Sequence, residues 1–98
     1  MSYSADVVKD RKISYACSNM SWHIMVEDII RVSGEQFRPL LAKIDYPHRV
    51  RWHDCKNIAK LIQRVKAEDC TFANDADLQE LHRVFETAAQ MKSSVDIW

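Results

Sequence analysis

Five cationic or imidazole side chains recur at helical spacing in the middle of the sequence. They are separated by four, three, four and four residues: Arg49, His53, Lys56, Lys60 and Arg64. On a helix these positions fall within about 80° of one another. A row of positive charge could contact the phosphates of a nucleic acid or the carboxylates of an acidic protein. The competing interpretation is a solvated helix face, although such faces usually mix charges of both signs.

Two tryptophans extend this candidate site. Trp52 lies about 60° beyond the apolar arc of the same predicted helix, beside the cationic row. An exposed tryptophan next to arginines is typical of a binding hot spot. Trp98 follows Val95 and Ile97 in an apolar stretch that is unusual for a free tail and indicates docking on the domain or on a partner. The residues predicted to bind a partner are Arg49, Trp52, His53, Lys56, Lys60, Arg64 and Trp98.

Nucleophilic and metal-binding side chains are present but lack a productive arrangement. His48 and His53 are five residues apart, which places them about 140° apart on a helix instead of on one face. Cys55 falls on the apolar side of that helix, whereas His53 falls on the polar side. Gly34 is the only glycine, so no glycine-rich loop can form an oxyanion hole or cradle a phosphate. We therefore expect no enzymatic activity, no metal site and no cofactor.

The cysteines and the first residues indicate a cytoplasmic protein. Cys17, Cys55 and Cys70 are 38 and 15 residues apart, a spacing that matches no disulfide framework and no paired zinc knuckle. Reduced thiols of this kind usually act as small buried hydrophobes. The first residues do not form a signal peptide, and no run of about 18 apolar residues could span a membrane. We expect a soluble, unexported chain without a membrane partner.

Formal charge is balanced overall but uneven along the chain. Fourteen basic residues stand against fourteen acidic ones. Residues 48–67 hold six basic side chains against Asp54, whereas residues 68–98 hold seven acidic side chains against Arg83 and Lys92. The acidic final segment could therefore neutralise the cationic row if the two were adjacent in the fold. Zero net charge also disfavours a nucleic-acid partner, because domains that bind nucleic acids are usually basic.

The strongest helix signal covers about residues 20–33. Its apolar side chains recur every three or four residues, as Trp22, Met25 and Ile29 do, which predicts a buried helix face with Ile29 in the core. A serine or asparagine at residues 18–21 could cap the first turn, and Gly34 follows the end. Because further apolar residues lie off this face, we expect a central helix that is covered on more than one side.

Three more helical segments are predicted. Within residues 35–44 a short helix has Pro39 in its first turn and ends near Ile44. Residues 45–67 form a long helix that begins at Asp45-Tyr46-Pro47, and a break near residues 52–54 is the alternative. Residues 68–73 form a connection, after which Asn74 caps a last helix. The apolar face of this last helix consists of Leu78, Leu81, Phe85 and Ala88.

Residues 4–17 are compatible with a helix, a strand or an extended arm. Ile13, Tyr15 and Cys17 alternate with other residues, as in a half-buried strand. A lone strand would have no evident partner within the chain, so we favour a helix or an arm. A strand here would instead allow pairing with a second copy of the chain in a symmetric dimer.

These patterns predict an all-α fold: one domain over residues 1–98, built as a compact bundle of four to five helices around the helix at about residues 20–33. We expect a small, cytoplasmic, non-enzymatic protein-binding module that acts as an adaptor, inhibitor or regulator of a larger complex. Its partner should have an acidic surface. The alternative is a nucleic-acid-binding regulator that uses the basic helix face at about residues 47–67, and a homodimer is compatible with both.

Overall fold

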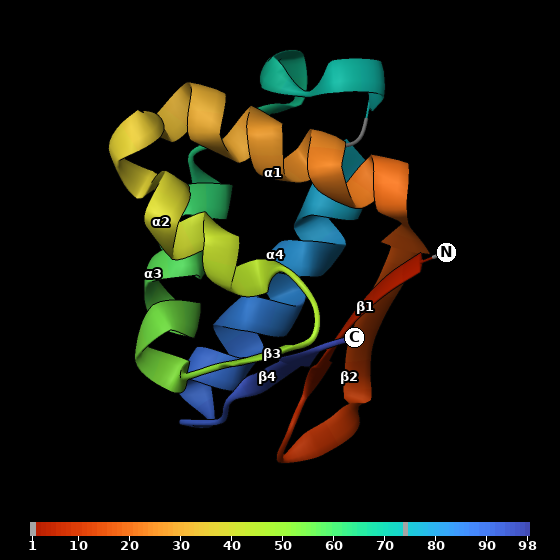
Figure 1. Cartoon of the computed structure of the whole chain (residues 1–98), viewed down its shortest axis with the longest axis vertical. Coiled ribbons are helices and arrows are strands. Elements are labelled where there is room, and N and C mark those ends of the chain that lie inside the picture. The colour runs from red at the N-terminus through yellow and green to blue at the C-terminus, as the bar shows by residue number, and fades with distance from the viewer. Residues whose placement is uncertain (1, 74) are drawn as a thin grey trace.

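The computed structural model describes residues 2–73 and 75–98. This part of the chain forms one antiparallel sheet, with the α-helices on one side of it (Figure 1). The strands are β1 (Ser2–Val7), β2 (Asp10–Ser18), β3 (His48–Val50) and β4 (Val95–Ile97). The α-helices are α1 (Asn19–Ser33), α2 (Arg38–Leu41), α3 (Trp52–Gln63) and α4 (Asp75–Gln90), and short 3₁₀ turns cover residues 35–37, 42–44, 67–69 and 71–73.

The prediction of an all-α helical bundle is wrong. Residues 2–18 form the β1–β2 hairpin, in which Ala5 lies opposite Tyr15, so the favoured helix or arm at residues 4–17 is a pair of strands. The alternation of Ile13 and Tyr15 was the correct signal, because both side chains pack against the core from β2. β2 therefore has a partner within the chain, namely β1, and β1 also pairs with the far end of the chain, where Ala5 lies opposite Ile97 of β4.

The apolar end of the chain docks inside the domain. β4 lies between β1 and β3, which gives the strand order β2-β1-β4-β3. Val95 and Ile97 of β4 are 0% and 1% exposed, because both side chains point from the sheet toward the helices. Trp98 follows β4 and stays 57% exposed. The first and last strands of the chain are therefore neighbours at the centre of the sheet.

The helix predicted at about residues 20–33 is present as α1. The Ser18 hydroxyl accepts a hydrogen bond from the Ser21 N–H group at 3.1 Å, and Gly34 follows the helix with a φ of 113°, which residues with a Cβ atom rarely adopt. Ile29 is fully buried. However, α1 is not the centre of a bundle, because the core lies between the helices and the sheet.

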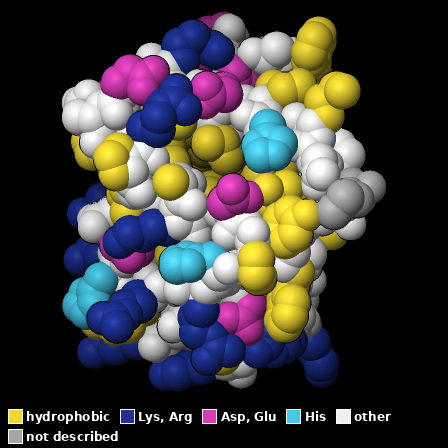
Figure 2. All heavy atoms as spheres, in the orientation of Figure 1, with side chains coloured by type: hydrophobic (Ala, Val, Ile, Leu, Met, Phe, Trp, Pro, Cys, Tyr) yellow, Lys and Arg dark blue, Asp and Glu magenta, His cyan; other side chains and the backbone are white. Residues whose placement is uncertain are grey.

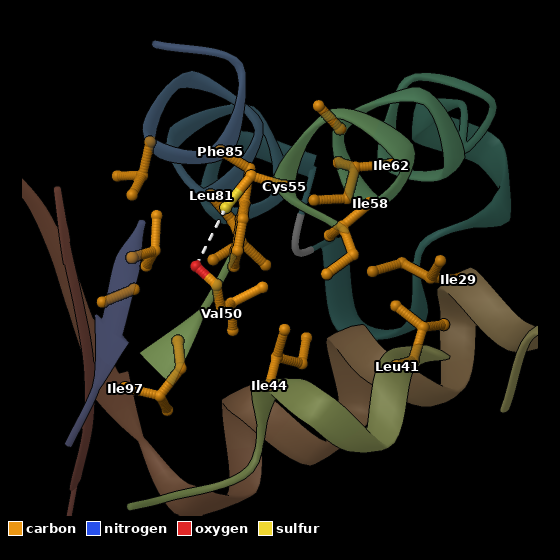
Figure 3. Close-up of a cluster of buried hydrophobic side chains, with 14 of the residues drawn as sticks. Ile29, Leu41, Ile44, Val50, Cys55, Ile58, Ile62, Leu81, Phe85 and Ile97 are labelled. Atoms are coloured by element: carbon orange, nitrogen blue, oxygen red, sulfur yellow. Dashed lines mark hydrogen bonds between the residues drawn. The ribbon is translucent and has the colours of Figure 1, made fainter. Parts of the chain in front are cut away.

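Figure 3 shows how the core joins these layers. Ile29, Leu41 and Ile44 approach it from α1 and from the segment that contains α2. Val50 and Ile97 approach it from the sheet. The other labelled side chains come from α3 and α4: Cys55, Ile58, Ile62, Leu81 and Phe85. Packing of one helical layer on one sheet face is a common way to bury an apolar core in a small domain.

The predicted long helix at residues 45–67 is also wrong at both ends, because α3 spans only Trp52–Gln63. Residues 48–50 form β3, which pairs with β4, and α3 begins only at Trp52. The break that was considered near residues 52–54 is therefore the correct alternative. The short helix at residues 35–44 is divided into α2 and two 3₁₀ turns. The last helix is present as α4, with its predicted apolar face buried, whereas the predicted cap at Asn74 lies outside the described residues.

Candidate functional site

The predicted binding residues separate into distinct places in the structure. Trp52, Lys56 and Lys60 line a groove between α3 and α4. Arg49 lies on β3, and Trp98 lies just after β4. The single helical row that was predicted from Arg49 to Arg64 is therefore broken at its first member, because Arg49 belongs to a strand.

The α3–α4 groove has a small-residue floor and long polar walls. Its volume is about 360 Å³, within the usual range for a binding site. Ala59 of α3 and Ala89 of α4 have short side chains between longer neighbours, which leaves space along the contact between the two helices. The remaining lining residues are Trp52, Lys56, Lys60, Gln63, His82, Glu86 and Gln90. α3 and α4 run antiparallel here, since the start of α3 and the end of α4 line the same end of the groove.

Trp52 is held at one end of this groove. Its side chain is half-buried, and its ring stacks on the His53 ring with 3.8 Å between ring centroids and 29° between ring planes. The Lys92 ammonium lies 5.9 Å from the centre of the Trp52 ring, a distance compatible with a cation–π contact. The indole is thus positioned by its neighbours while part of its surface remains open to a partner.

The positive charges beside the groove are not neutralised by direct ion pairs. Lys56, Lys60 and Arg64 are exposed, and none forms an ion pair with any residue that the structure describes. The acidic residues of α4 have neighbours on their own helix: Glu80 pairs with Arg83 at 3.0 Å, and Glu86, which lines the groove with Lys56 and Lys60, lies 3.5 Å from His82. The acidic last helix therefore adds the Glu86 carboxylate to the groove but forms no direct ion pair with Lys56, Lys60 or Arg64 within the described residues.

Arg49 belongs to a network of ion pairs on the face of the sheet opposite the helices. Its Nε and Nη2 atoms lie 2.6 and 3.0 Å from the two carboxylate oxygens of Asp96. Arg11 bridges Asp96 and Asp6, at 2.9 Å from each. The hydrogen bond from Arg49, followed by that from Arg11, holds the pKa of Asp96 below its usual value despite partial burial. The Trp98 indole N–H group donates to Asp6 at 3.2 Å, so Trp98 belongs to this network.

A second hollow adjoins β3 and has a volume of about 550 Å³. It brings together Arg49 and His53 from the predicted site, with Arg51 and His48 nearby. Figure 2 shows Lys and Arg side chains gathered along the lower edge of the molecule. Two of the basic side chains that line the hollow are already paired: Arg49 with Asp96, and Lys43 with Asp54 at 3.0 Å. The α3–α4 groove is therefore the stronger candidate, because its lysines are unpaired and its floor is apolar.

Several groove residues were missed by the sequence analysis. His82, Glu86 and Gln90 are spaced four residues apart on α4, so their shared helix face could have been recognised. Nothing in that spacing indicated that this face would lie beside α3. Lys92 was missed because it follows α4 and reaches Trp52 only through the fold.

Comparisons with protein-family models, with curated proteins and with solved structures find no match to this chain. The candidate site is therefore interpreted from its own geometry. Among the described residues, no group of three or more histidine, cysteine or acidic side chains is arranged to hold a metal ion. In the same part of the chain, no helix has the length and apolar character needed to cross a membrane.

Proposed function

We propose that the protein is a small, cytoplasmic, non-enzymatic protein-binding module, an adaptor, inhibitor or regulator of a larger complex, and that it docks its partner in the α3–α4 groove. The observation that carries this proposal is the half-buried Trp52 at the end of an apolar-floored groove beside the unpaired Lys56 and Lys60. Large aromatic side chains surrounded by polar residues supply much of the free energy of protein binding.

The groove favours a partner segment that is acidic and carries an apolar side chain. Lys56 and Lys60 line one wall without internal carboxylate partners, so carboxylates of a partner could pair with them. The floor at Ala59 and Ala89 can receive one apolar side chain that contacts Trp52. The positive charge would increase the rate of association, whereas burial of Trp52 would supply most of the affinity.

The state of the cysteines supports a cytoplasmic location. Cys17, Cys55 and Cys70 are all unpaired in the fold. Exported proteins of this size often use disulfides for stability, whereas cytoplasmic thiols stay reduced. This chain buries a continuous core without such bonds.

Replacement of Trp52 by alanine is expected to release the partner. Tagged parent and Trp52→Ala proteins should be compared in affinity capture from extracts of the native cell, followed by titration of the purified partner. We expect the dissociation constant to rise about 30-fold, which corresponds to a hot-spot loss of about 2 kcal/mol.

Trp98→Ala is the matched control, since it removes an exposed tryptophan from the sheet face and leaves the groove intact. A partner that binds the parent and Trp98→Ala equally, but binds Trp52→Ala weakly, would support the groove. Equal binding by Trp52→Ala, with unchanged thermal unfolding, would contradict this assignment.

A nucleic acid is the second candidate partner. It is favoured by the unpaired Lys56 and Lys60 on an exposed side of α3 and by the unpaired Arg64 that directly follows this helix. These charges could neutralise phosphates, and Trp52 could stack on an unpaired base. The pairing of Arg49 with Asp96 weakens this alternative, because it engages one of the predicted phosphate contacts.

The salt dependence of DNA binding distinguishes the two candidates. If α3 follows a phosphate backbone, the affinity for duplex or single-stranded DNA should fall steeply with salt. Lys60→Ala and Arg64→Ala should each reduce the slope of log affinity against log salt by about one. Lys43→Ala serves as the control, because Lys43 is paired with Asp54. Absence of binding at low salt would exclude this alternative.

A further inference from the structure

The two edges of the sheet differ in how much backbone they leave open. β3 forms one edge, but it has only three residues and follows Pro47, which has no N–H group. β2 forms the other edge and has nine residues, of which Ser14 to Ser18 pair with β1 in regular register. Within residues 2–73 and 75–98, β1 is the only strand that pairs with β2. Long unprotected edges of this kind can accept another strand.

The hydrogen bonds of β1 identify which groups of β2 face this open edge. Ser4 exchanges two backbone hydrogen bonds with Trp98, at 3.3 and 2.9 Å, so its N–H and C=O groups point toward β4. Ala16 lies opposite Ser4 on the other side of β1. Because backbone direction alternates in antiparallel strands, Ser4 and Ala16 form a non-hydrogen-bonded pair. The N–H and C=O groups of Ala16 therefore point away from the sheet, and those of Ser14 do the same.

Only one of these outward groups has a protein partner in the described part of the chain. The Arg83 Nη2 atom of α4 donates to the Ser14 carbonyl at 3.2 Å. The same guanidinium bonds to Glu80 at 3.0 and 3.1 Å, so it has an alternative acceptor on its own helix. The Ser14 N–H group and both backbone groups of Ala16 remain free at the edge.

The side chains of β2 form a self-complementary pattern. Ile13, Tyr15 and Cys17 share the inner face, where they are half-buried against the core at the rim of the sheet. Antiparallel pairing of two β2 strands centred on Tyr15 would set Tyr15 against its own copy and Ile13 against Cys17. On the outer face it would set the small residues Ser14 and Ala16 opposite each other. β2 leaves its regular register with β1 before Ser14, so the pairing is confined to residues 13–17, which carry no charged side chain.

We propose that a second copy of this chain binds at β2, and that the two four-stranded sheets join into one continuous antiparallel sheet around a two-fold axis at Tyr15. Ser14 and Ala16 of each copy exchange backbone hydrogen bonds with the other copy, and Arg83 turns from Ser14 to Glu80. A second copy fits better than a charged partner because the chain has zero net charge, so self-association meets no net repulsion. The interface leaves the α3–α4 groove outside the paired strands.

The test is sedimentation of the full chain over a range of concentrations, compared with Ala16→Pro. Proline removes the outward N–H group of Ala16, which is not used in pairing with β1, and proline is tolerated at edge positions of this type. We expect the parent to form dimers as concentration rises and Ala16→Pro to remain monomeric with an unchanged far-UV circular dichroism spectrum. A parent that stays monomeric up to about 1 mM, the weakest range for specific association, would overturn the proposal.

Two further measurements keep the test informative if Ala16→Pro does not fold. Arg83→Ala removes the group that competes for the Ser14 carbonyl, so the dimer should become about fivefold tighter or more. Arg64→Ala makes the same charge change away from β2 and should leave the dimer unchanged. In the parent, hydrogen exchange at the Ala16 amide should slow as concentration rises. Association that neither responds to Arg83→Ala nor protects this amide would place the dimer interface elsewhere and overturn the proposal.

Discussion

Truncation of the chain after Ser94 is expected to abolish cooperative folding. This change removes β4, which lies between β1 and β3 and pairs with both. It removes the fully buried side chains of Val95 and Ile97, each of which contributes about 1.5 to 3 kcal/mol by burial. It also leaves β3 without a partner strand and exposes one side of β1. Together these losses approach the total stability of about 5 to 15 kcal/mol that is typical of a domain.

Far-UV circular dichroism and thermal unfolding provide the measurement. The truncated chain should lack a cooperative transition at any temperature. Deletion of Trp98 alone is the control, because it keeps β4 and removes a side chain that is 57% exposed. That variant should unfold cooperatively at a slightly lower temperature. A cooperative transition in the chain that ends at Ser94 would show that the helices and the β1–β2 hairpin form a stable core without β4.

Asp28→Ala is expected to destabilise the protein by about 3 kcal/mol, since hydrogen bonds to buried charged groups are worth more than neutral ones. Asp28 is on α1 and only 1% exposed. Its carboxylate accepts hydrogen bonds from the Thr71 N–H group at 2.9 Å, from the Thr71 hydroxyl at 2.7 Å and from Arg31 at 2.8 Å. These contacts attach the connection before α4 to α1. Glu27→Ala is the control at an exposed neighbouring position and should cost about 0.5 kcal/mol or less.

Because of the Asp28 carboxylate, the free energy of unfolding should depend on pH in the acidic range. Burial raises the pKa of Asp28, but the hydrogen bonds from Thr71 and Arg31 outweigh burial and bring the pKa below its usual value. A lowered pKa in the folded state stabilises the fold above the usual carboxyl pKa of about 3.9, and this contribution is lost as pH falls through the folded value. The free energy of unfolding should therefore decrease more between about pH 5 and pH 2 in the parent than in Asp28→Asn. Equal decreases in the two proteins would contradict the assignment.

The sequence predicted the longer helices better than the sheet. α1 and α4 carry apolar residues at helical spacing over many turns, as Ile29 and Phe85 illustrate, and this pattern is local. β3 and β4 have three residues each, which is too short for a period of two to be distinguished from chance. β1 and β4 pair across almost the whole chain, so neither strand indicated the other. The alternation in β2 was a local signal, but it was not assigned to a strand because its partner β1, which directly precedes it in the sequence, was not recognised.

The α3 side of the candidate site was predicted from the sequence, because its residues follow a local helical spacing. The α4 side was not predicted, because it depends on tertiary packing. Trp52, Lys56 and Lys60 share one helix, so their spacing placed them together. Arg49 was assigned to that helix because proline after an aspartate and a tyrosine is typical of a helix start, yet the following residues pair with β4 instead. The α4 wall of the groove depends on how two helices pack. This packing is fixed by buried residues such as Ile58 and Leu81 and not by the polar residues that line the groove.

Because Cys55 is buried, its reaction with a thiol reagent can report local opening of the fold. Its thiol is fully buried between α3 and the sheet and donates to the Val50 carbonyl at 3.6 Å (Figure 3). Burial raises its pKa to about 12, so the reactive thiolate is almost absent in the closed molecule. Cys17 and Cys70 are only partly covered. A thiol reagent that reaches Cys55 therefore records molecules in which α3 has separated from the sheet, and its rate reports how often this part of the fold opens.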